Sequence, residues 1–142
     1  MQTAADILKT KGNEIWSVSP DDTILKAIRI MAERQVGALL VLSNDKLCGI
    51  VSERDYTRKV ALEGLSSSDA LVSQIMSTKV LCARPDQTVQ ECMALMSDKR
   101  ARHLPVVDHK QIIGVISIGD LVKNIIAEQQ FEIEALQYYI TH

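Results

Sequence analysis

Two short stretches of the sequence decide the fold: GIVSERD (Gly49–Asp55) and GVISIGD (Gly114–Asp120). Each consists of glycine, two β-branched residues, serine, two variable residues and aspartate, and the second follows the first by 65 residues. At this offset, residues 15–60 align without gaps with residues 80–125, and nine of the 46 aligned positions are identical. Similarity at one fixed offset predicts that the chain contains two copies of the same structural unit.

The residues around each stretch predict the same order of elements in both copies. Apolar residues at helical spacing in residues 24–31 and 89–96 predict an amphipathic helix, and a proline precedes each helix. Two short apolar runs follow, separated by polar residues 43–46 or 108–111, which indicates a β-hairpin. The pattern alone leaves a parallel pairing of these strands open. A second helix begins near the serine of each stretch.

Each copy therefore reads strand, helix, strand, strand, helix, and neither copy is large enough to bury both faces of its own sheet. We expect an α/β (α+β) fold in which the two copies pack about a pseudo-twofold axis and form two equivalent clefts, followed by a long C-terminal helix. The expected division is a first repeat with its leader (1–62), a linker (63–70), a second repeat (71–127) and a C-terminal helix extension (128–142).

The composition is that of a globular protein, with 46% hydrophobic and 24% charged residues. A net charge of −2 gives no general attraction to nucleic acid or to an anionic membrane. The longest apolar run, residues 36–42, is too short to span a bilayer, and the N-terminus lacks the apolar core of a signal peptide. The three cysteines form no C-x-x-C pair, so we expect free thiols in a cytoplasmic protein.

Two interpretations of the Gly–Ser–Asp stretch are compatible with each other. In the first, serine and aspartate form a capping box at a helix start, and the glycine allows another part of the backbone to approach closely. In the second, the free amides at the helix N-terminus bind an anion, with serine donating to a phosphate and aspartate accepting from ribose hydroxyl groups. The glycine would then leave room for a flat base.

The tandem repeat, the order of elements and the repeated motif resemble the cystathionine-β-synthase (CBS) domain family, whose paired domains are called a Bateman module. The resemblance covers about residues 4–127. The segments ADILKTKGN (residues 5–13, the first leader) and VSQIMSTK (residues 72–79, the second leader) also resemble the segments that precede each domain in this family. The resemblance implies a regulatory module that binds AMP, ADP, ATP, NAD or S-adenosylmethionine without turning it over.

The resemblance also implies roles for individual residues in both copies. Asp55 and Asp120 would hold the ribose hydroxyl groups, and Ser52 and Ser117 would contact phosphate. The base would lie between residues of the middle strands, namely Gly37, Ala38, Leu39, His103, Leu104 and Pro105 on one side and Ile50, Val51, Val115 and Ile116 on the other.

The two candidate sites differ in the helix that follows the serine. Arg54 and Arg58 stand four residues apart, so on a regular helix they share one face and form a positive patch of polyphosphate size. The alternative is a solvated, salt-bridged helix face, since Glu53 precedes Arg54. In the second copy Ile118 and Gly119 replace Glu53 and Arg54, and we include Gly119 among the candidate ligand contacts.

A second basic cluster, KRARH, ends with Arg102 and His103. Cations near a helix C-terminus are favourable without any ligand, which explains part of the cluster. Arg102 and His103 stand where the first copy has the small residues Gly37 and Ala38, so the two clefts need not bind the same ligand. We expect one nucleotide at the Asp120 site, with phosphates that reach basic groups of either copy.

The histidines and serines do not indicate catalysis or a metal. His109 lies in a predicted hairpin turn, and no cysteine or acid is placed to complete a coordination sphere with His103 and His109. Neither serine has a base evident in the sequence. We therefore expect no enzyme, and three other possibilities stay open: a small enzyme acting on the nucleotide, a nucleic-acid-binding protein that uses the basic clusters, and a structural dimerisation module without ligand.

The C-terminal segment predicts a long helix with an apolar seam. The seam residues follow 4-3-4-3-4 spacing, which is typical of a coiled coil: Val122, Ile126, Gln129, Ile133, Leu136 and Ile140. The helix either folds across its own module or packs on a second chain, where Gln129 would help to fix the register. We expect a homodimer that signals through a regulated partner protein, which the sequence does not identify.

Overall fold

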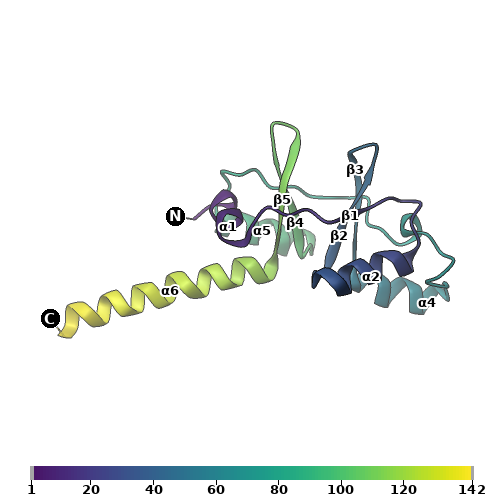
Figure 1. Ribbon diagram of the computed structural model, residues 1–142. Coiled ribbons are helices and arrows are strands. Elements are labelled where there is room, and N and C mark those ends of the chain that lie inside the picture. Colours follow the sequence, from purple (N-terminus) through teal and green to yellow (C-terminus); the bar gives the residue numbers. More distant parts are fainter. Residues whose placement is uncertain (1, 142) are drawn as a thin grey trace. The chain divides into compact units, whose positions relative to one another are not determined.

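The computed structural model describes residues 2–141 and consists of two compact units (Figure 1). The first-repeat unit is Ile15–Val80. The second-repeat unit joins the N-terminal segment up to Glu14 to the chain from Leu81 onward. The predicted mixed α/β fold, with two copies of one unit and a long C-terminal helix, is confirmed.

The first-repeat unit contains a three-stranded sheet in the order β1-β2-β3, with β1 parallel and β3 antiparallel to β2. Its strands and helices are β1 (Ser17–Val18), α2 (Ile24–Arg34), β2 (Ala38–Ser43), β3 (Lys46–Ser52), α3 (Glu53–Asp55), the π-helical segment η1 (Tyr56–Val60), α4 (Ala61–Glu63) and the 3₁₀ turn η2 (Val72–Gln74).

The second-repeat unit repeats this arrangement with longer helices at its two ends. Its elements are α1 (Ala4–Lys11), α5 (Val89–Lys99), β4 (His103–Asp108), β5 (Gln111–Ser117) and α6 (Ile118–Thr141). A parallel bridge between Ala83 and Val106 takes the place of the pairing of β1 with β2. No helix within residues 2–141, α6 included, is both long enough and apolar enough to cross a membrane.

Both hairpins are antiparallel, which removes the alternative of a parallel pairing. Each has a two-residue turn in which both residues have positive φ: Asn44 and Asp45 at 51° and 62°, and His109 and Lys110 at 48° and 65°. Two successive residues with positive φ are typical of a type I′ turn, which matches the twist of the paired strands. The register also shifts at the same place in β2 and in β4, so the repeat extends to the irregularities of its strands.

Each unit has its own hydrophobic core. The apolar face predicted for the first helix of each copy is confirmed, because Ile24, Ala27 and Met31 are buried in α2 as their counterparts Val89, Cys92 and Met96 are in α5. Threonine caps both helices, since the hydroxyl of Thr23 accepts from the Lys26 amide and that of Thr88 from the Glu91 amide.

Each leader packs with the repeat that it does not precede. The first leader forms most of α1, and the Ala4 amide donates to the Gln87 carbonyl oxygen at 2.9 Å in the second-repeat unit. The second leader begins with η2, and the Val72 amide donates to the Asp22 carbonyl oxygen at 2.8 Å in the first-repeat unit. The compact units therefore exchange their leaders relative to the order of the sequence.

The glycine of each motif stands against a leader. A Cβ atom on Gly49 would lie 2.8 Å from Met76 Sδ and 2.9 Å from the Ser77 carbonyl oxygen. A Cβ atom on Gly114 would lie 2.6 Å from Leu8 Cδ2. The expectation that these glycines leave room for a base is therefore wrong, and the close approach of another segment explains them.

We expect Gly49→Ala to destabilise the protein more than Gly114→Ala. The new methyl group at Gly49 meets the Ser77 backbone, which is fixed because the amides of Ile50 and Ser77 each donate to the other residue's carbonyl oxygen. At Gly114 it meets only the end of the Leu8 side chain. Overpacking of this kind costs about 1–3 kcal/mol. Urea unfolding measures both variants, and a Gly49→Ala protein as stable as the wild type would contradict the explanation.

Candidate functional site

In the first-repeat unit, the motif lies where β3 ends and α3 begins. The Ser52 amide and hydroxyl donate to Asp55 Oδ2 at 2.9 and 3.1 Å, and the Asp55 amide donates to Ser52 Oγ at 3.3 Å. This reciprocal arrangement is a capping box. It holds the carboxylate of Asp55 at the end of the strand.

The second-repeat unit has the same geometry where β5 ends and α6 begins. The Ser117 amide donates to Asp120 Oδ2 at 2.8 Å, and the Asp120 amide donates to Ser117 Oγ at 3.2 Å. The capping interpretation is therefore confirmed in both copies. The same bonds place a hydroxyl group and a carboxylate side by side at a helix N-terminus, which the binding interpretation also requires.

The structure brings the predicted base-side residues of each copy to the same end of its hairpin. Ala38 pairs with Ser52 across β2 and β3, and His103 pairs with Ser117 across β4 and β5. The Glu53 amide, the first of α3, donates to the Gly37 carbonyl oxygen at 3.1 Å. The Ile118 amide, the first of α6, donates to the Arg102 carbonyl oxygen at 2.9 Å.

Four predicted wall residues lie in the cores instead, Leu39 among them. Val51, Leu104 and Ile116 are at most 1% exposed, so their side chains support the sites from behind and are not open to a ligand. Side chains alternate between the two faces of a strand, so Ile50 and Val115, which precede Val51 and Ile116, are only half-buried. These two remain candidates for contact with the base. Pro105 is buried as well.

The helix after Ser52 is not a regular α-helix. Its middle is the π-helical segment Tyr56–Val60, in which the hydrogen-bond spacing differs from that of an α-helix. A spacing of four residues therefore no longer implies that Arg54 and Arg58 lie on one face. Arg58 is exposed, and Arg54 is half-buried with an interaction partner. The Asp55 carboxylate forms an ion pair with Lys59, whose Nζ lies 4.0 Å from Asp55 Oδ1.

Lys11, at the end of α1, is a site residue that the sequence analysis missed. Its Nζ donates to Asp120 Oδ2 at 2.7 Å and to the Val115 carbonyl oxygen at 2.6 Å. The sequence carries no signal for this contact, because each leader contains a lysine at the corresponding position, Lys11 and Lys79. This ion pair joins two residues that are 109 positions apart, and it adds a cation to the second site.

The charges at the second site are coupled. Burial would raise the pKa of Asp120, but the hydrogen bonds from Lys11 and from the Ser117 amide outweigh it, so the pKa is lowered overall and the carboxylate is ionised at neutral pH. Burial, followed by the nearby charge of Lys11, lowers the pKa of His103, and Asp120 opposes this only in part. At neutral pH the site therefore combines an ammonium group, a carboxylate and a neutral imidazole.

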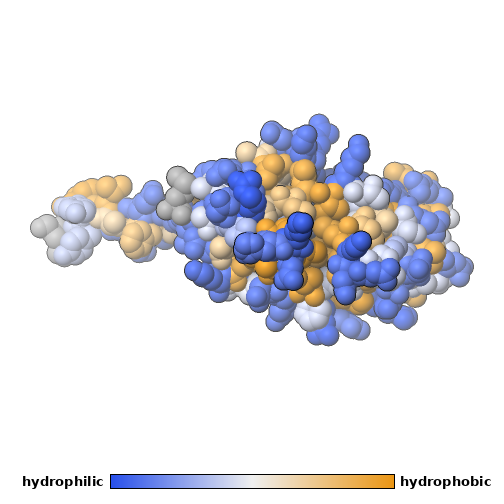
Figure 2. Space-filling view, turned by 90° about the horizontal axis from the view of Figure 1, so that it is seen from above, coloured by the Kyte–Doolittle hydropathy of each residue, from blue (hydrophilic) through white to orange (hydrophobic). Residues whose placement is uncertain are grey.

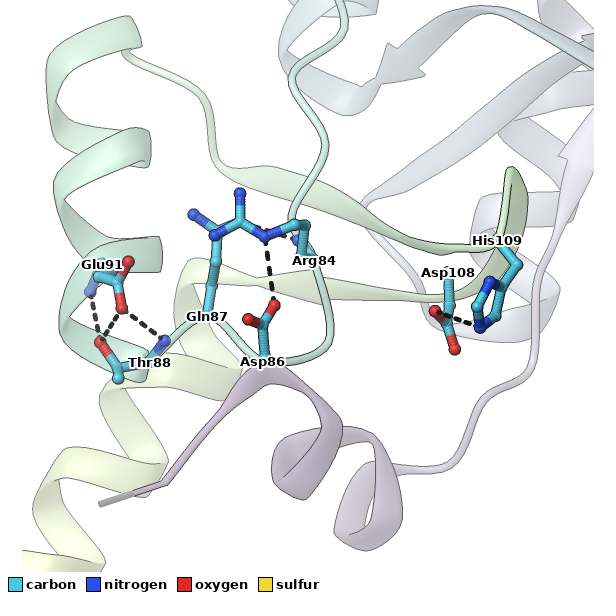
Figure 3. Close-up of polar contacts among 7 residues, drawn as sticks. All are labelled: Arg84, Asp86, Gln87, Thr88, Glu91, Asp108 and His109. Atoms are coloured by element: carbon cyan, nitrogen blue, oxygen red, sulfur yellow. Dashed lines mark hydrogen bonds and ion pairs between the residues drawn. The ribbon is translucent and has the colours of Figure 1, made fainter.

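Within residues 2–141, no three His, Cys, Asp or Glu side chains are grouped so that they could hold a metal ion. His109 lies in the hairpin turn, as predicted, with Nε2 3.6 Å from Asp108 Oδ1 (Figure 3).

Comparisons with known proteins agree with this geometry. The family model described as CBS domain matches residues 4–62 and 72–127. The mitochondrial CBS domain-containing protein CBSX3 of Arabidopsis thaliana is 38% identical over 97% of this chain and 71% of its own length. A solved structure from Burkholderia ambifaria MC40-6, described as a signal-transduction protein with CBS domains, is 50% identical with a TM-score of 0.87 and covers 90% of this chain and 96% of its own.

A further solved structure shares the fold at lower identity. The CBS domain pair of protein MJ0100, in complex with 5′-methylthioadenosine and S-adenosyl-L-methionine, has a TM-score of 0.78 at 21% identity and covers 90% of this chain and 98% of its own.

Proposed function

Because this chain belongs to the CBS-domain family, we propose that it is a non-catalytic sensor of adenosine-containing ligands such as AMP, ADP, ATP or NAD. One observation carries the proposal: the serine–aspartate pair stands at a strand end and a helix start in both repeats, with the same hydrogen bonds. The pair combines an acceptor for ribose hydroxyl groups with a hydroxyl donor for phosphate. The adenosine-derived ligands of the MJ0100 domain pair also support the proposal.

In the proposed mode of binding, ribose hydroxyl groups donate to the carboxylates of Asp55 and Asp120, and phosphate approaches Ser52 and Ser117. A carboxylate that is ionised at neutral pH accepts such bonds more strongly than a neutral group does. The ligand exchanges part of the capping bonds for bonds to itself. Binding and capping therefore use the same atoms.

The proposed output is a change of conformation read by a partner protein. A ligand shifts a conformational equilibrium only by its difference in affinity for the two states. A tenfold difference corresponds to about 1.4 kcal/mol. Such a difference biases an equilibrium without fixing it, which suits a sensor. The identity of the partner stays open.

The two sites should differ in affinity. The first has the small residues Gly37 and Ala38 beside Ser52, whereas the second has Arg102 next to the strand end and Lys11 on Asp120. A negatively charged ligand is favoured where cations surround it. We therefore expect nucleotide phosphates to bind preferentially at the second site.

A thermal-shift screen with AMP, ADP, ATP, NAD, NADH and S-adenosylmethionine tests the proposal. A ligand at one hundred times its dissociation constant stabilises the folded state by about 2.7 kcal/mol, so a binding ligand should raise the melting temperature measurably. The matched control is 2′,3′-dideoxy-ATP, which has no ribose hydroxyl groups for the aspartates and should give a much smaller shift than ATP. A screen without any shift would favour the structural module. Conversion of the nucleotide during incubation would favour an enzyme.

The assembly that we propose is a homodimer formed through α6. The apolar residues of its seam are at least 41% exposed from Val122 onward, so the second-repeat unit leaves this seam uncovered. Figure 2 shows orange, apolar side chains on the part of α6 near the C-terminus. A second copy of α6 would cover them, since the 4-3-4-3-4 spacing suits a coiled coil. The cysteines Cys48, Cys82 and Cys92 are free, which suits the cytosol that we propose as the compartment.

A further inference from the structure

The contacts of Lys11 differ from those of its counterpart in the other unit. Helix α1 and the second leader begin with matching backbone hydrogen bonds. The Ala4 amide donates to Gln87 and the Val72 amide to Asp22. Gln87 and Asp22 are equivalent positions of the two repeats. Counted from these bonds, Lys11 corresponds to Lys79. Lys79 is exposed and forms no hydrogen bond or ion pair within residues 2–141.

The different lengths of the two leader helices explain this contrast. Helix α1 continues to Lys11 and brings its ammonium group to Asp120. The 3₁₀ turn η2 ends at Gln74, after which Ser77 pairs with Ile50, so no helix continues to Lys79. One site therefore receives a lysine from its leader and the other does not.

The ammonium group of Lys11 bonds to the carboxylate that the proposed function assigns to the ribose. It donates to Asp120 Oδ2, the oxygen that also accepts from the Ser117 amide, and to the Val115 carbonyl oxygen. The Asp120 side chain is only 19% exposed. A ribose hydroxyl group that bonds to Oδ2 competes with the ammonium group for a partly buried carboxylate, and breaking such a pair is unfavourable unless the released charge finds another partner.

We propose that Lys11 makes the Asp120 site selective for phosphorylated adenosine compounds over neutral nucleosides. This inference rests on the proposed function. A 5′-phosphate is carried by the same sugar that Asp120 would hold, so it can accept the ammonium group that the hydroxyl groups displace. Arg102 adds positive charge on the adjacent strand end. A nucleoside without phosphate leaves Lys11 with no new partner and therefore binds weakly.

Calorimetric titration of the full chain with adenosine and with AMP tests this inference. The background variant is Asp55→Asn, which weakens the first site while keeping a side-chain acceptor for the Ser52 amide. The measured quantity is the dissociation constant for adenosine divided by that for AMP. In Lys11→Met we expect tighter adenosine binding and a ratio at least tenfold lower, because both the competing ammonium group and the phosphate contact are lost.

Two further variants serve as controls. Lys79→Met removes the corresponding lysine of the second leader and should leave the ratio unchanged, and Lys11→Arg keeps the charge and should keep the ratio above that of Lys11→Met. If both compounds bind and the ratio in Lys11→Met lies within twofold of the ratio in the background variant, Lys11 does not set the selectivity. The proposed function stands in that case. If neither compound binds any variant, both proposals fall.

Discussion

Asp120→Ala is expected to weaken AMP binding at the second site by about a hundredfold or more. The substitution removes the carboxylate that would accept from two ribose hydroxyl groups, and a hydrogen bond to a charged group contributes about 1.5–3 kcal/mol. Calorimetric titration of AMP measures the loss. Adenosine should lose at least as much, since it has no phosphate to gain from the released Lys11.

A control for this substitution is needed because Asp120 also caps α6. The structure offers one in α5, where the Thr88 amide donates to Glu91 Oε1 at 3.3 Å and the Glu91 amide donates to Thr88 Oγ1 at 3.1 Å (Figure 3). Glu91→Ala removes the acid of this capping box and should leave AMP affinity unchanged. Unchanged affinity in Asp120→Ala would remove Asp120 from the site.

Replacing both Ile126 and Ile133 by lysine is expected to convert a dimer into a monomer. The two residues are 60% and 49% exposed, and both belong to the seam of α6. In a paired helix each lysine would place an unpaired charge in an apolar contact, which is strongly unfavourable. Sedimentation velocity at micromolar concentration distinguishes the two states.

Phe131 provides the matched control for the dimer prediction. It is 72% exposed, but with 3.6 residues per turn it lies on the face of α6 opposite Ile126 and Ile133. Phe131→Lys should therefore leave the dimer intact. A wild-type protein that sediments as a monomer at micromolar concentration would contradict the assignment of α6 to self-association.

The parts of the fold that depend on neighbours in sequence could be predicted. The offset of 65 residues placed Ser52 and Ser117 at equivalent positions, and both cap a helix as their spacing to aspartate predicts. The hairpins follow in the same way, because polar residues between two apolar runs favour a turn. The capping and turn preferences of neighbouring residues determine these features, and such preferences can be read from the sequence.

The parts that depend on packing between distant segments could not be predicted. The exchange of leaders joins residues at least 50 positions apart at the start of each leader, and the pair of Lys11 and Asp120 is 109 positions apart. A lysine at the end of an amphipathic helix looks like any solvated lysine. The burial of Val51 and Ile116 could have been inferred, because alternation along a strand places them opposite Ile50 and Val115. The irregular helix after Asp55 has no such signal, since its residues are compatible with an α-helix.

The most direct test of the central claim is a crystal structure of the full chain grown with AMP. The account predicts that a ribose hydroxyl group lies within hydrogen-bonding distance of the Asp120 carboxylate, and that Ser117 Oγ and Lys11 Nζ turn toward the phosphate. A structure in which AMP is bound elsewhere, while Asp120 keeps its bonds to the Ser117 amide and to Lys11, would contradict it.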